Sequence, residues 1–303
     1  MKFSVKILGC SSATPTKHRN PSAQVVTMGD KMFLIDCGEG TQMQLRKYGV
    51  KFQRIEHIFI SHLHGDHYLG LAGLLFTMHL FGRSAALHVY GNSVLMDILR
   101  LQLEVSATTL VYPLVFHALE PEKATVLWED ELIRISSFPL VHRVPTHGFR
   151  FEEKHELLHL NRERIEKLHI PFGELARIKR GGDYVDSHGK LHANASLTLK
   201  REAPKVFAYC SDTAYSREIV PHVAGADLLY HETTFMHDMA ATAAEKQHST
   251  TRQAAEIALE AQAKKLLIGH FSARYDDLMP LLEETRGVFE RTELAEEGES
   301  YEV

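Results

Sequence analysis

Short apolar runs alternate with helix-forming stretches along most of the chain. Phe3, Val5 and Ile7 alternate with polar residues, which is typical of a strand with one buried face. Similar runs predict further strands at residues 32–36, 55–61, 85–91, 110–116, 131–140, 146–151, 207–210, 228–230 and 266–268. Helical composition predicts helices at residues 41–48, 94–104 and 251–263, and another that begins at Asp66, whose carboxylate can cap it. Because strands and helices interleave, the pattern predicts an α/β fold with mixed sheets.

One long segment, approximately residues 152–204, lacks this alternation. It holds few long apolar runs and two turn-rich stretches, at Pro171–Gly173 and Gly181–Asp183. Residues 154–180 carry seven basic and four acidic side chains, a local charge of +3. Such a charge excess is typical of a solvated insertion, and it also fits an arm that holds a polyanion. The sequence leaves both interpretations open.

The composition indicates a folded chain with an uneven charge. Hydrophobic residues make up 44% and charged residues 24% of the 303 positions, enough to bury a sizeable core. The net charge of −5 argues against a protein that coats nucleic acid indiscriminately. Residues 283–303 contain eight acids and two bases, a local −6, which leaves +1 on the remainder. We therefore expect an acidic C-terminal tail at approximately 290–303, and a local basic patch elsewhere stays open.

The cysteine and apolar patterns indicate the cellular compartment. Cys10, Cys37 and Cys210 have no paired spacing and cannot form a disulfide framework, which fits a reducing compartment. No apolar run approaches the roughly 18 uncharged residues of a membrane-spanning helix. We therefore expect a cytoplasmic protein with no membrane partner.

The strongest chemical signal follows directly after a predicted strand. Ser61 is followed by His62, His64, Asp66 and His67, so four potential ligands occupy six residues. Neutral imidazole nitrogens and carboxylate oxygens are suitable ligands for zinc. Without a metal, this segment would bury several polar groups that need partners. The spacing therefore predicts a metal site at the end of this strand.

The His-x-His-x-Asp-His motif resembles that of the metallo-β-lactamase superfamily. The resemblance implies one domain over residues 1–303, folded as an αββα sandwich of two mixed sheets flanked by helices, with two zinc ions per subunit. Manganese can occupy the same kind of nitrogen and oxygen site. By the resemblance, one zinc binds His62, His64 and His142, the other binds Asp66, His67 and His270, and Asp212 bridges both. Asp36 matches the superfamily's first motif and is expected to support a ligand rather than to bind metal.

Four further motifs accompany the metal motif. Pro15–Asn20 fits P-x-K-x-R-N, His231–Phe235 is similar to an H-E-A-T loop, His248–Thr250 reads H-S-T, and His270–Tyr275 fits H-x-S-x-R-Y. Together they resemble the ribonuclease Z family in its short form, over residues 1 to about 290. Two departures stand out. Thr233 replaces the usual Ala, and residues 171–173 and 178–181 only approximate the family's Gly-Pro pair and Lys-Gly turn.

This resemblance implies a zinc-dependent endoribonuclease that removes 3′ trailers from precursor tRNA. Hydroxide would attack the phosphodiester and leave a tRNA 3′-hydroxyl and a trailer 5′-phosphate. Asp66 would steer the hydroxide as general base, and His248, supported by Glu232, would protonate the departing oxygen. His231 would orient Glu232. The alternative for His248 is a residue that only belongs to a helix-capping segment.

The resemblance also implies contacts with precursor tRNA. The residues expected to make them are Lys17, Arg19 and Asn20 near the first strand, and Lys179 and Arg180 in an arm that grips the tRNA elbow. A solvated loop face is the alternative for Lys17 and Arg19. Arg274 either packs the loop of His270 or contacts phosphate, and the sequence leaves both open. A homodimer is implied, in which the arm of one subunit serves the active site of the other.

Two other functions stay open from the sequence. A broad-range metal-dependent phosphodiesterase that acts on RNA or small molecules fits the incomplete arm motifs. A non-catalytic scaffold is a different class, but such scaffolds have lost ligands, whereas all seven implied ligands are present here. Comparing cleavage of precursor tRNA with cleavage of small diesters would separate the two enzymes, and metal analysis would reveal a scaffold.

Overall fold

The computed structural model of the chain describes residues 2–154, 158–199 and 203–303. They form two compact units. The first comprises residues up to 128, 135–151 and 206–303, and the second comprises 129–134 and 152–205. The predicted arm at 152–204 falls in the second unit, and its residues 155–157 and 200–202 lie outside the described residues. Within the described ranges, no helix is both long and apolar enough to cross a bilayer.

The first sheet pairs antiparallel in one half and parallel in the other. From edge to edge its strands are β16 (Ser300–Glu302), β1 (Phe3–Gly9), β2 (Ala23–Met28), β3 (Lys31–Ile35), β4 (Ile55–Phe59), β5 (Leu87–Gly91) and β6 (Leu114–Ala118). Strands β16 to β3 pair antiparallel, whereas β3 to β6 pair parallel. The loops that follow the parallel strands β3, β4 and β5 therefore leave this sheet at the same end.

The second sheet has a parallel half of the same kind. Its order is β15 (Thr292–Leu294), β14 (Leu266–Gly269), β13 (Leu228–Glu232), β12 (Val206–Cys210), β9 (Thr146–Glu153), β8 (Ile133–Leu140) and β7 (Thr125–Glu129). Strands β12 to β15 pair parallel. The loops after β12, β13 and β14 consequently emerge together.

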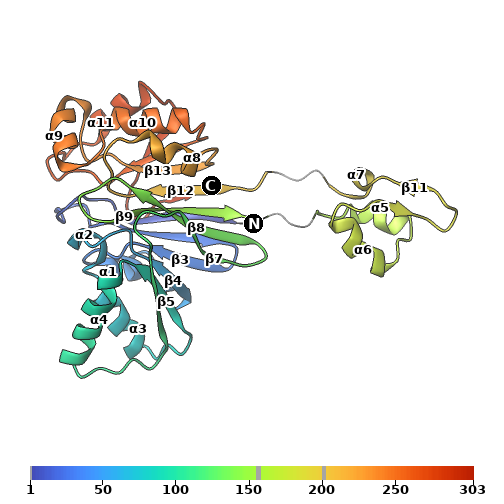
Figure 1. Cartoon of the computed structure of the whole chain (residues 1–303), viewed down its shortest axis with the longest axis horizontal. Helices are drawn as coiled ribbons and strands as arrows, with labels where there is room; N and C mark the ends of the chain where they lie inside the picture. Colours follow the sequence, from blue (N-terminus) through green and yellow to red (C-terminus); the bar gives the residue numbers. More distant parts are fainter. Residues whose placement is uncertain (1, 155–157, 200–202) are drawn as a thin grey trace. The chain divides into compact units, whose positions relative to one another are not determined.

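Helices cover the outer faces of both sheets (Figure 1). On the side of the first sheet lie α1 (Thr41–Lys47), α3 (Leu71–Leu80) and α4 (Ser93–Val105). On the side of the second lie α8 (Val220–Val223), α9 (Ala240–Lys246), α10 (Thr251–Glu260) and α11 (Met279–Arg286). Short 3-10 turns occur at η1 (Phe52–Arg54), η2 (Arg217–Ile219) and η3 (His237–Met239). The predicted sandwich of two mixed sheets flanked by helices is confirmed.

Alternation along the strands builds two hydrophobic layers. In β3, Leu34 belongs to one buried cluster with Leu74 of α3, whereas its neighbour Phe33 points between the sheets. The centre of the Phe151 ring on β9 lies 5.7 Å from the ring of Phe33 and 5.7 Å from that of Phe59. Burial of one such side chain contributes about 1.5–3 kcal/mol, so these layers supply much of the folding free energy.

Several elements of the structure differ from the prediction. Strand β2 escaped prediction because nearly all of its residues are buried, so it shows no alternation. The strand expected at 110–116 lies at Leu114–Ala118. The helix expected from Asp66 is divided into α2 (Gly65–Tyr68) and α3, which are separated near Gly70. A Cβ at Gly70 would lie 2.1 Å from the carbonyl oxygen of Gly38, so this close approach of two backbones requires glycine.

Residues 290–303 are part of the sheets, so the expectation of a separate acidic tail is wrong. Strand β15 pairs with β14, and β16 pairs with β1. Between them, Gly298 donates its N–H to the carbonyl of Ile7. Gly298 has a φ of 92°, and a Cβ there would lie 2.4 Å from the ring of Tyr48. The prediction rested on the net charge of the segment, which gave no indication that positions such as Thr292 and Ala295 are buried.

The second unit has a small core of its own. Its elements are α5 (Arg162–Lys167), α6 (Phe172–Lys179), β10 (Tyr184–Val185), β11 (Leu191–His192) and α7 (Asn194–Leu197). Ile170, Ile178, Tyr184 and Leu197 are buried together. The helices α5, α6 and α7 and the strand β10 each contribute only one or two apolar side chains to this core, which explains the lack of long apolar runs in the sequence.

A row of histidines crosses the first sheet. His57 on β4 is 6% exposed, and its ring stacks on that of His88 on β5 with 4.9 Å between ring centres. His88 Nδ1 lies 2.9 Å from Nε2 of His117 on β6. Burial, followed by the neighbouring His88, Lys31 and His117, lowers the pKa of His57 to about 3. The fold therefore stabilises the neutral ring of His57.

Acid is expected to destabilise the metal-free protein in part through His57. The ring titrates near 6.5 in the unfolded chain, so its stabilisation is fully present above that pH and is lost as pH falls toward 3, by about 1.4 kcal/mol per pH unit. Urea unfolding of EDTA-treated wild type and His57→Phe at pH 7.5 and 5.5 tests this. The loss of unfolding free energy should be about 1 kcal/mol smaller in the variant. Equal losses would contradict the assignment.

Candidate active site

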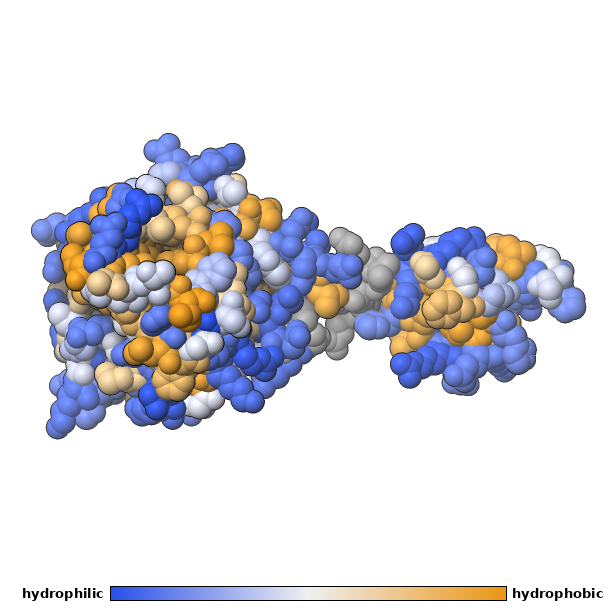
Figure 2. Space-filling model, turned by 90° about the horizontal axis from the view of Figure 1, so that it is seen from below, coloured by the Kyte–Doolittle hydropathy of each residue, from blue (hydrophilic) through white to orange (hydrophobic). Residues whose placement is uncertain are grey.

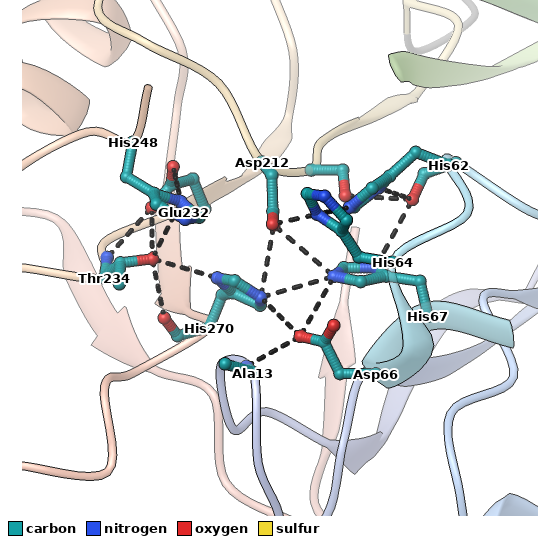
Figure 3. Close-up of polar contacts among 12 residues, drawn as sticks. Ala13, His62, His64, Asp66, His67, Asp212, Glu232, Thr234, His248 and His270 are labelled. Carbon is teal, nitrogen blue, oxygen red and sulfur yellow. Dashed lines mark hydrogen bonds and ion pairs between the residues drawn. The ribbon is translucent and has the colours of Figure 1, made fainter. Parts of the chain in front are cut away.

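The metal motif lies where β4 ends. Asp66 and His67 are in α2, which begins shortly after the end of that strand. His142 follows β8, Asp212 follows β12 and His270 follows β14. Figure 3 shows the labelled side chains converging from loops of both sheets. The carboxyl ends of parallel strands are where α/β proteins commonly gather functional side chains.

The converging side chains form overlapping sets, in which one ligand atom per residue lies within 4.8 Å of the others. The sets are His62, His64, His142 and Asp212, then Asp66, His67 and His270, then Asp212, His248 and His270. Asp212 joins the first set to its neighbours, because its Oδ2 is 3.5 Å from His62 Nε2 and its Oδ1 is 3.1 Å from His270 Nε2. The structure thus brings together all seven residues that the resemblance implied as ligands.

Outer hydrogen bonds fix which ring nitrogen of three histidines faces the centre. His142 Nδ1 donates to the carbonyl of Gln247 at 2.8 Å, and His67 Nδ1 donates to Asp36 at 2.8 Å. His270 Nδ1 lies 2.9 Å from the hydroxyl of Thr234. With these protons outside, each neutral ring directs the Nε2 lone pair inward.

This arrangement fits bound cations. His67 Nε2 and His270 Nε2 lie 3.3 Å apart, and His64 Nδ1 lies 3.3 Å from His142 Nε2, so lone pairs face one another. Asp212 Oδ1 is buried among them without a hydrogen-bond donor. Facing lone pairs and a buried carboxylate oxygen repel unless a positive charge lies between them. Nitrogen and oxygen donors of this kind suit zinc.

Burial and neighbouring charges shift the pKa values of the convergent histidines and carboxylates. Burial lowers the pKa of His62 to about 4 and lowers the pKa of His142, so both rings favour the neutral, ligating form. Burial opposes the charge of Asp66, but contacts with His67 and His270 hold the pKa of that carboxyl well below its usual range. Burial likewise opposes a charge on His67, yet the surrounding carboxylates raise its pKa.

Asp36 supports His67 from behind. Its Oδ2 accepts hydrogen bonds from His67 Nδ1 and, at 2.7 Å, from the hydroxyl of Tyr209. Its Oδ1 accepts the N–H of Ser61 at 2.7 Å. Asp36 has a φ of 56°, in the left-handed region that non-glycine residues rarely adopt. Asp36 is therefore held in a strained backbone conformation, and this conformation sets the position of its carboxylate.

Glu232 and His248 form a buried ion pair beside the centre. His248 Nδ1 lies 2.9 Å from Glu232 Oε1, which also accepts the N–H of Ser249 at 2.9 Å. Burial alone would favour the neutral ring of His248, but the Glu232 carboxylate raises its pKa to about 9. Burial opposes the charge of Glu232 too, and His248 outweighs it and lowers the pKa of that carboxyl. His248 is therefore protonated at neutral pH and can act as an acid.

Two site contacts were not identified from the sequence. The hydroxyl of Thr234 donates to Glu232 Oε2 at 2.7 Å and lies 2.9 Å from His270 Nδ1, so it links the ion pair to the metal centre (Figure 3). The main-chain N–H of Ala13 donates to Asp66 Oδ2 at 2.7 Å, and Ala13 has a φ of 60°. Thr234 stands in the recognised loop, directly after Thr233, and could have been found there. A main-chain donor leaves no signal in the sequence.

The structure corrects the role expected for His231. Its Nδ1 contacts the main-chain carbonyl of Glu232 at 2.8 Å, not the carboxylate. The two residues are neighbours on β13, so their side chains point to opposite faces of the sheet. The carboxylate of Glu232 is instead oriented by Thr234, Ser249 and the N–H of Thr213.

The loop with Lys17, Arg19 and Asn20 is bound to the protein at two of these three residues. Arg19 Nη2 donates to the carbonyl of Tyr275 at 2.7 Å, and Asn20 donates to Glu297 through both its main chain and its side chain. Lys17 is exposed. Arg19 and Asn20 therefore act as anchors of this loop, and only Lys17 is presented to solvent.

Arg274, in the loop of His270, is exposed and contacts neighbouring side chains. Its guanidinium lies 5.1 Å from the centre of the Phe235 ring, and its Nε is 3.3 Å from Ser272 Oγ. The stacking geometry is that of a cation–π contact.

Lys179 and Arg180 lie at the end of α6 in the second unit. With Phe172, Leu175 and Ala176 they line a hollow of about 270 Å³. Phe172 is 89% exposed, which is unusual for a phenylalanine. The hollow thus combines an open aromatic face with two cationic side chains.

Comparisons with known proteins agree with the geometry of the site. The chain is 48% identical over 297 residues to ribonuclease Z of Bacteroides fragilis, with 98% of each chain covered. It is 43% identical over 304 residues to ribonuclease Z of Cytophaga hutchinsonii, covering 100% of this chain and 97% of the relative. The family model described as anti-Pycsar protein Apyc1 matches residues 3–292. The relatives also align beyond residue 290, where the resemblance had been taken to end.

Solved structures share the fold. Human tRNase Z, short form, is 29% identical to the chain, with a TM-score of 0.73 and 98% of both chains covered. YhfI from Bacillus subtilis, a metallo-β-lactamase fold protein, is 20% identical with a TM-score of 0.71 over 100% of both chains, which shows the fold alone. The resemblance inferred from the motifs is confirmed: the chain belongs to the ribonuclease Z family, and its fold is that of the metallo-β-lactamase superfamily.

Proposed function

We propose that this chain is a zinc-dependent endoribonuclease that removes 3′ trailers from precursor tRNA. The observation that carries the proposal is the pair of His/Asp sets joined by Asp212, in a chain of the ribonuclease Z family. The products are a tRNA with a 3′-hydroxyl and a trailer with a 5′-phosphate.

The seven convergent side chains would hold two divalent cations, and the carboxylate of Asp212 lies beside both sets. When bound, such cations supply hydroxide at neutral pH and offset the negative charge at phosphorus. Nitrogen and oxygen donors suit Zn²⁺ and also admit Mn²⁺. Elemental analysis of the purified protein measures the number and identity of the ions, and two zinc ions per chain are expected.

Three acidic and basic side chains of the site move or hold protons. Asp66, fixed by the N–H of Ala13, is placed to accept the proton of the attacking water and to aim it at phosphorus. Protonated His248 donates to the departing 3′ oxygen, so that the leaving group departs as a hydroxyl. Glu232 does not meet the substrate in this scheme. It keeps His248 charged and oriented through the contact at 2.9 Å.

Cleavage mapping tests the proposed activity. Zinc-loaded protein should cut a 3′-extended precursor tRNA at the trailer junction, leave the stated end groups, and lose this activity with EDTA. Equal efficiency on unstructured RNA and on bis-p-nitrophenyl phosphate would favour the broad-range phosphodiesterase instead. A protein that cuts none of these substrates would overturn both.

We propose that the second unit contacts the body of the tRNA. The support is the hollow on α6, where Phe172 offers a stacking surface and Lys179 and Arg180 offer positive charge. Stacking on aromatic rings and ion pairing with phosphates are the two general contacts for RNA.

The double variant Lys179→Ala/Arg180→Ala should raise the KM for precursor tRNA by roughly tenfold and lower the salt dependence of binding by about two ions. The loss on bis-p-nitrophenyl phosphate should be much smaller, because that substrate has a single phosphate and offers no further one to Lys179 and Arg180. Lys123→Ala/Arg100→Ala, which removes the same charge from exposed positions in the first unit, is the control. Equal losses on both substrates would contradict a separate docking surface.

We propose that the chain acts as a homodimer. Apolar side chains gather on the face that carries α3 and α4 (Figure 2), where Leu80, Leu101 and Val105 are 80%, 60% and 78% exposed. Such exposed apolar surface is typical of protein interfaces. Light scattering should give twice the chain mass of 34.3 kDa, and a mass of one chain would contradict the dimer.

We also propose a cytoplasmic location. Cys10, Cys37 and Cys210, all within the described residues, are buried and unpaired, which fits a reducing compartment. Burial raises the pKa of Cys37 to about 12, so this thiol stays protonated and unreactive. Fractionation of expressing cells tests the location.

A further inference from the structure

A carboxylate near the C-terminus is bonded to the loop that precedes β2. Glu297 lies between β15 and β16 and is half-buried. Its carboxylate accepts the main-chain N–H of Asn20, Asn20 Nδ2 at 2.8 Å, and Nε2 of Gln44 on α1 at 2.8 Å. Hydrogen bonds to an ionised acceptor are roughly twice as strong as those between neutral groups. Glu297 thus joins three separate parts of the chain.

The segment around Glu297 is itself fixed to β1. The N–H of Gly298 donates to the carbonyl of Ile7, and the N–H of Ile7 donates to the carbonyl of Glu299. Lys6 Nζ donates to the carbonyl of Gly298 at 2.6 Å. The Glu297 carboxylate is therefore a fixed anchor for its partners.

The loop that Glu297 holds, residues 13–20, begins at the metal centre. The N–H of Ala13 contacts Asp66, and the preceding Ser12 is held independently through its N–H to the carbonyl of Phe271. At the other end, Asn20 is held by Glu297. Lys17 lies in the exposed part between these two attachments, four residues from the one that contacts the metal centre.

We infer that Glu297 is a positioning residue for RNA: through Asn20 it holds the 13–20 loop so that Lys17 meets the substrate backbone beside the site of cleavage. The inference rests on the proposed function. Lys17 is the one cation of its motif that is not bonded to the protein in this way, since Arg19 donates to the carbonyl of Tyr275. A phosphate contact needs such a free cationic side chain, and its position depends on the backbone that carries it.

The structure also predicts which step Glu297 affects. Without its carboxylate, Asn20 loses the acceptor of both its main-chain and its side-chain N–H groups and keeps only the bond from the N–H of Ser11 to its carbonyl, beside the bond of Arg19 to Tyr275. The Ala13 end keeps its bond to Asp66 and the neighbouring bond to Phe271. Chemistry at the metal centre should therefore continue. Binding of a long RNA that reaches Lys17 should weaken, because fixing a freed loop on binding costs conformational entropy.

The experiment compares the zinc-loaded full chain with Glu297→Ala. The KM for 3′-extended precursor tRNA should rise by roughly tenfold, which corresponds to about 1.4 kcal/mol. The kcat for bis-p-nitrophenyl phosphate and the zinc content should stay within about twofold of wild type. Glu299→Ala removes the same charge from an exposed neighbour whose side chain lacks these bonds to Asn20 and Gln44, and it should behave as wild type. If Glu297→Ala does not fold, Glu297→Gln, which keeps the shape, takes its place.

A reversed pair separates positioning from general stability. Asn20→Asp alone sets two carboxylates against each other and should raise the KM at least as much as Glu297→Ala. Asn20→Asp/Glu297→Gln restores one N–H···O bond and should recover part of the KM. Unchanged KM in Glu297→Ala, or equal losses on both substrates, would overturn this inference alone. Wild-type protein that does not cut precursor tRNA would overturn the proposed function as well.

Discussion

Asp212→Asn should remove at least one bound metal ion and reduce precursor tRNA cleavage by about 1000-fold. Asp212 is 2% exposed, and its carboxylate lies 3.1 Å from His270 Nε2, 3.5 Å from His62 Nε2 and 3.8 Å from His142 Nε2. Asparagine keeps the volume but loses the charge and one acceptor oxygen. A 1000-fold slower reaction corresponds to about 4 kcal/mol in activation free energy.

Zinc content and kcat/KM are measured together on the same preparation. Asp97→Asn, an exposed aspartate on α4, is the matched control and should keep both values. Retention of both metals and of the full rate in Asp212→Asn would show that this residue does not join the two sets.

His248→Ala is expected to lower kcat by roughly 100- to 1000-fold while the zinc content stays unchanged. His248 is paired with Glu232 and holds a proton at neutral pH, so its loss removes the acid and leaves the seven convergent side chains in place. His237→Ala is the control, because the His237 ring contacts Thr250 and is outside the convergent sets. Full turnover in His248→Ala would remove this residue from the reaction.

The pH profile tests the partner of His248. Because the pKa of His248 is raised to about 9, turnover should fall as pH rises through that region and the acid is lost. In Glu232→Gln the carboxylate charge is gone, so the pKa of His248 returns toward 6.5 and the fall should begin at least about one pH unit lower. Bound cations act on both proteins alike, so the difference between the profiles reports Glu232. Identical alkaline limbs would contradict the ion pair as the cause.

The convergent side chains could be predicted because of where they stand in the sequence. His142, Asp212 and His270 each come after an apolar strand. Asp212 and His270 follow the parallel strands β12 and β14, and side chains after parallel strands meet at one end of a sheet. The alternation of strands and helices predicted an α/β fold with mixed sheets, and the resemblance to the metallo-β-lactamase superfamily implied that these residues share one site. Histidine and aspartate residues at the ends of strands are therefore the site residues that could be identified from this sequence.

Contacts between distant segments could not be predicted in the same way. Asn20 and Glu297 are 277 residues apart, and neither type of residue specifies its partner. The charge of Arg19 predicted a need for acceptors, and the sequence did not show that main-chain carbonyls of Ser272 and Tyr275 are among them. The acidic count near the C-terminus suggested a solvated tail, although hydrogen bonds to β1 and β14 place that segment in the sheets. The composition of this segment gives its charge, whereas its position depends on strand pairing, which composition does not show.

Anomalous diffraction from crystals of the zinc-loaded protein, collected at the zinc edge, tests the central claim most directly. We predict two peaks, one among His62, His64 and His142 and one among Asp66, His67 and His270, with Asp212 beside both. A zinc-loaded protein that cuts precursor tRNA but shows no anomalous peak at Asp212 would contradict the account.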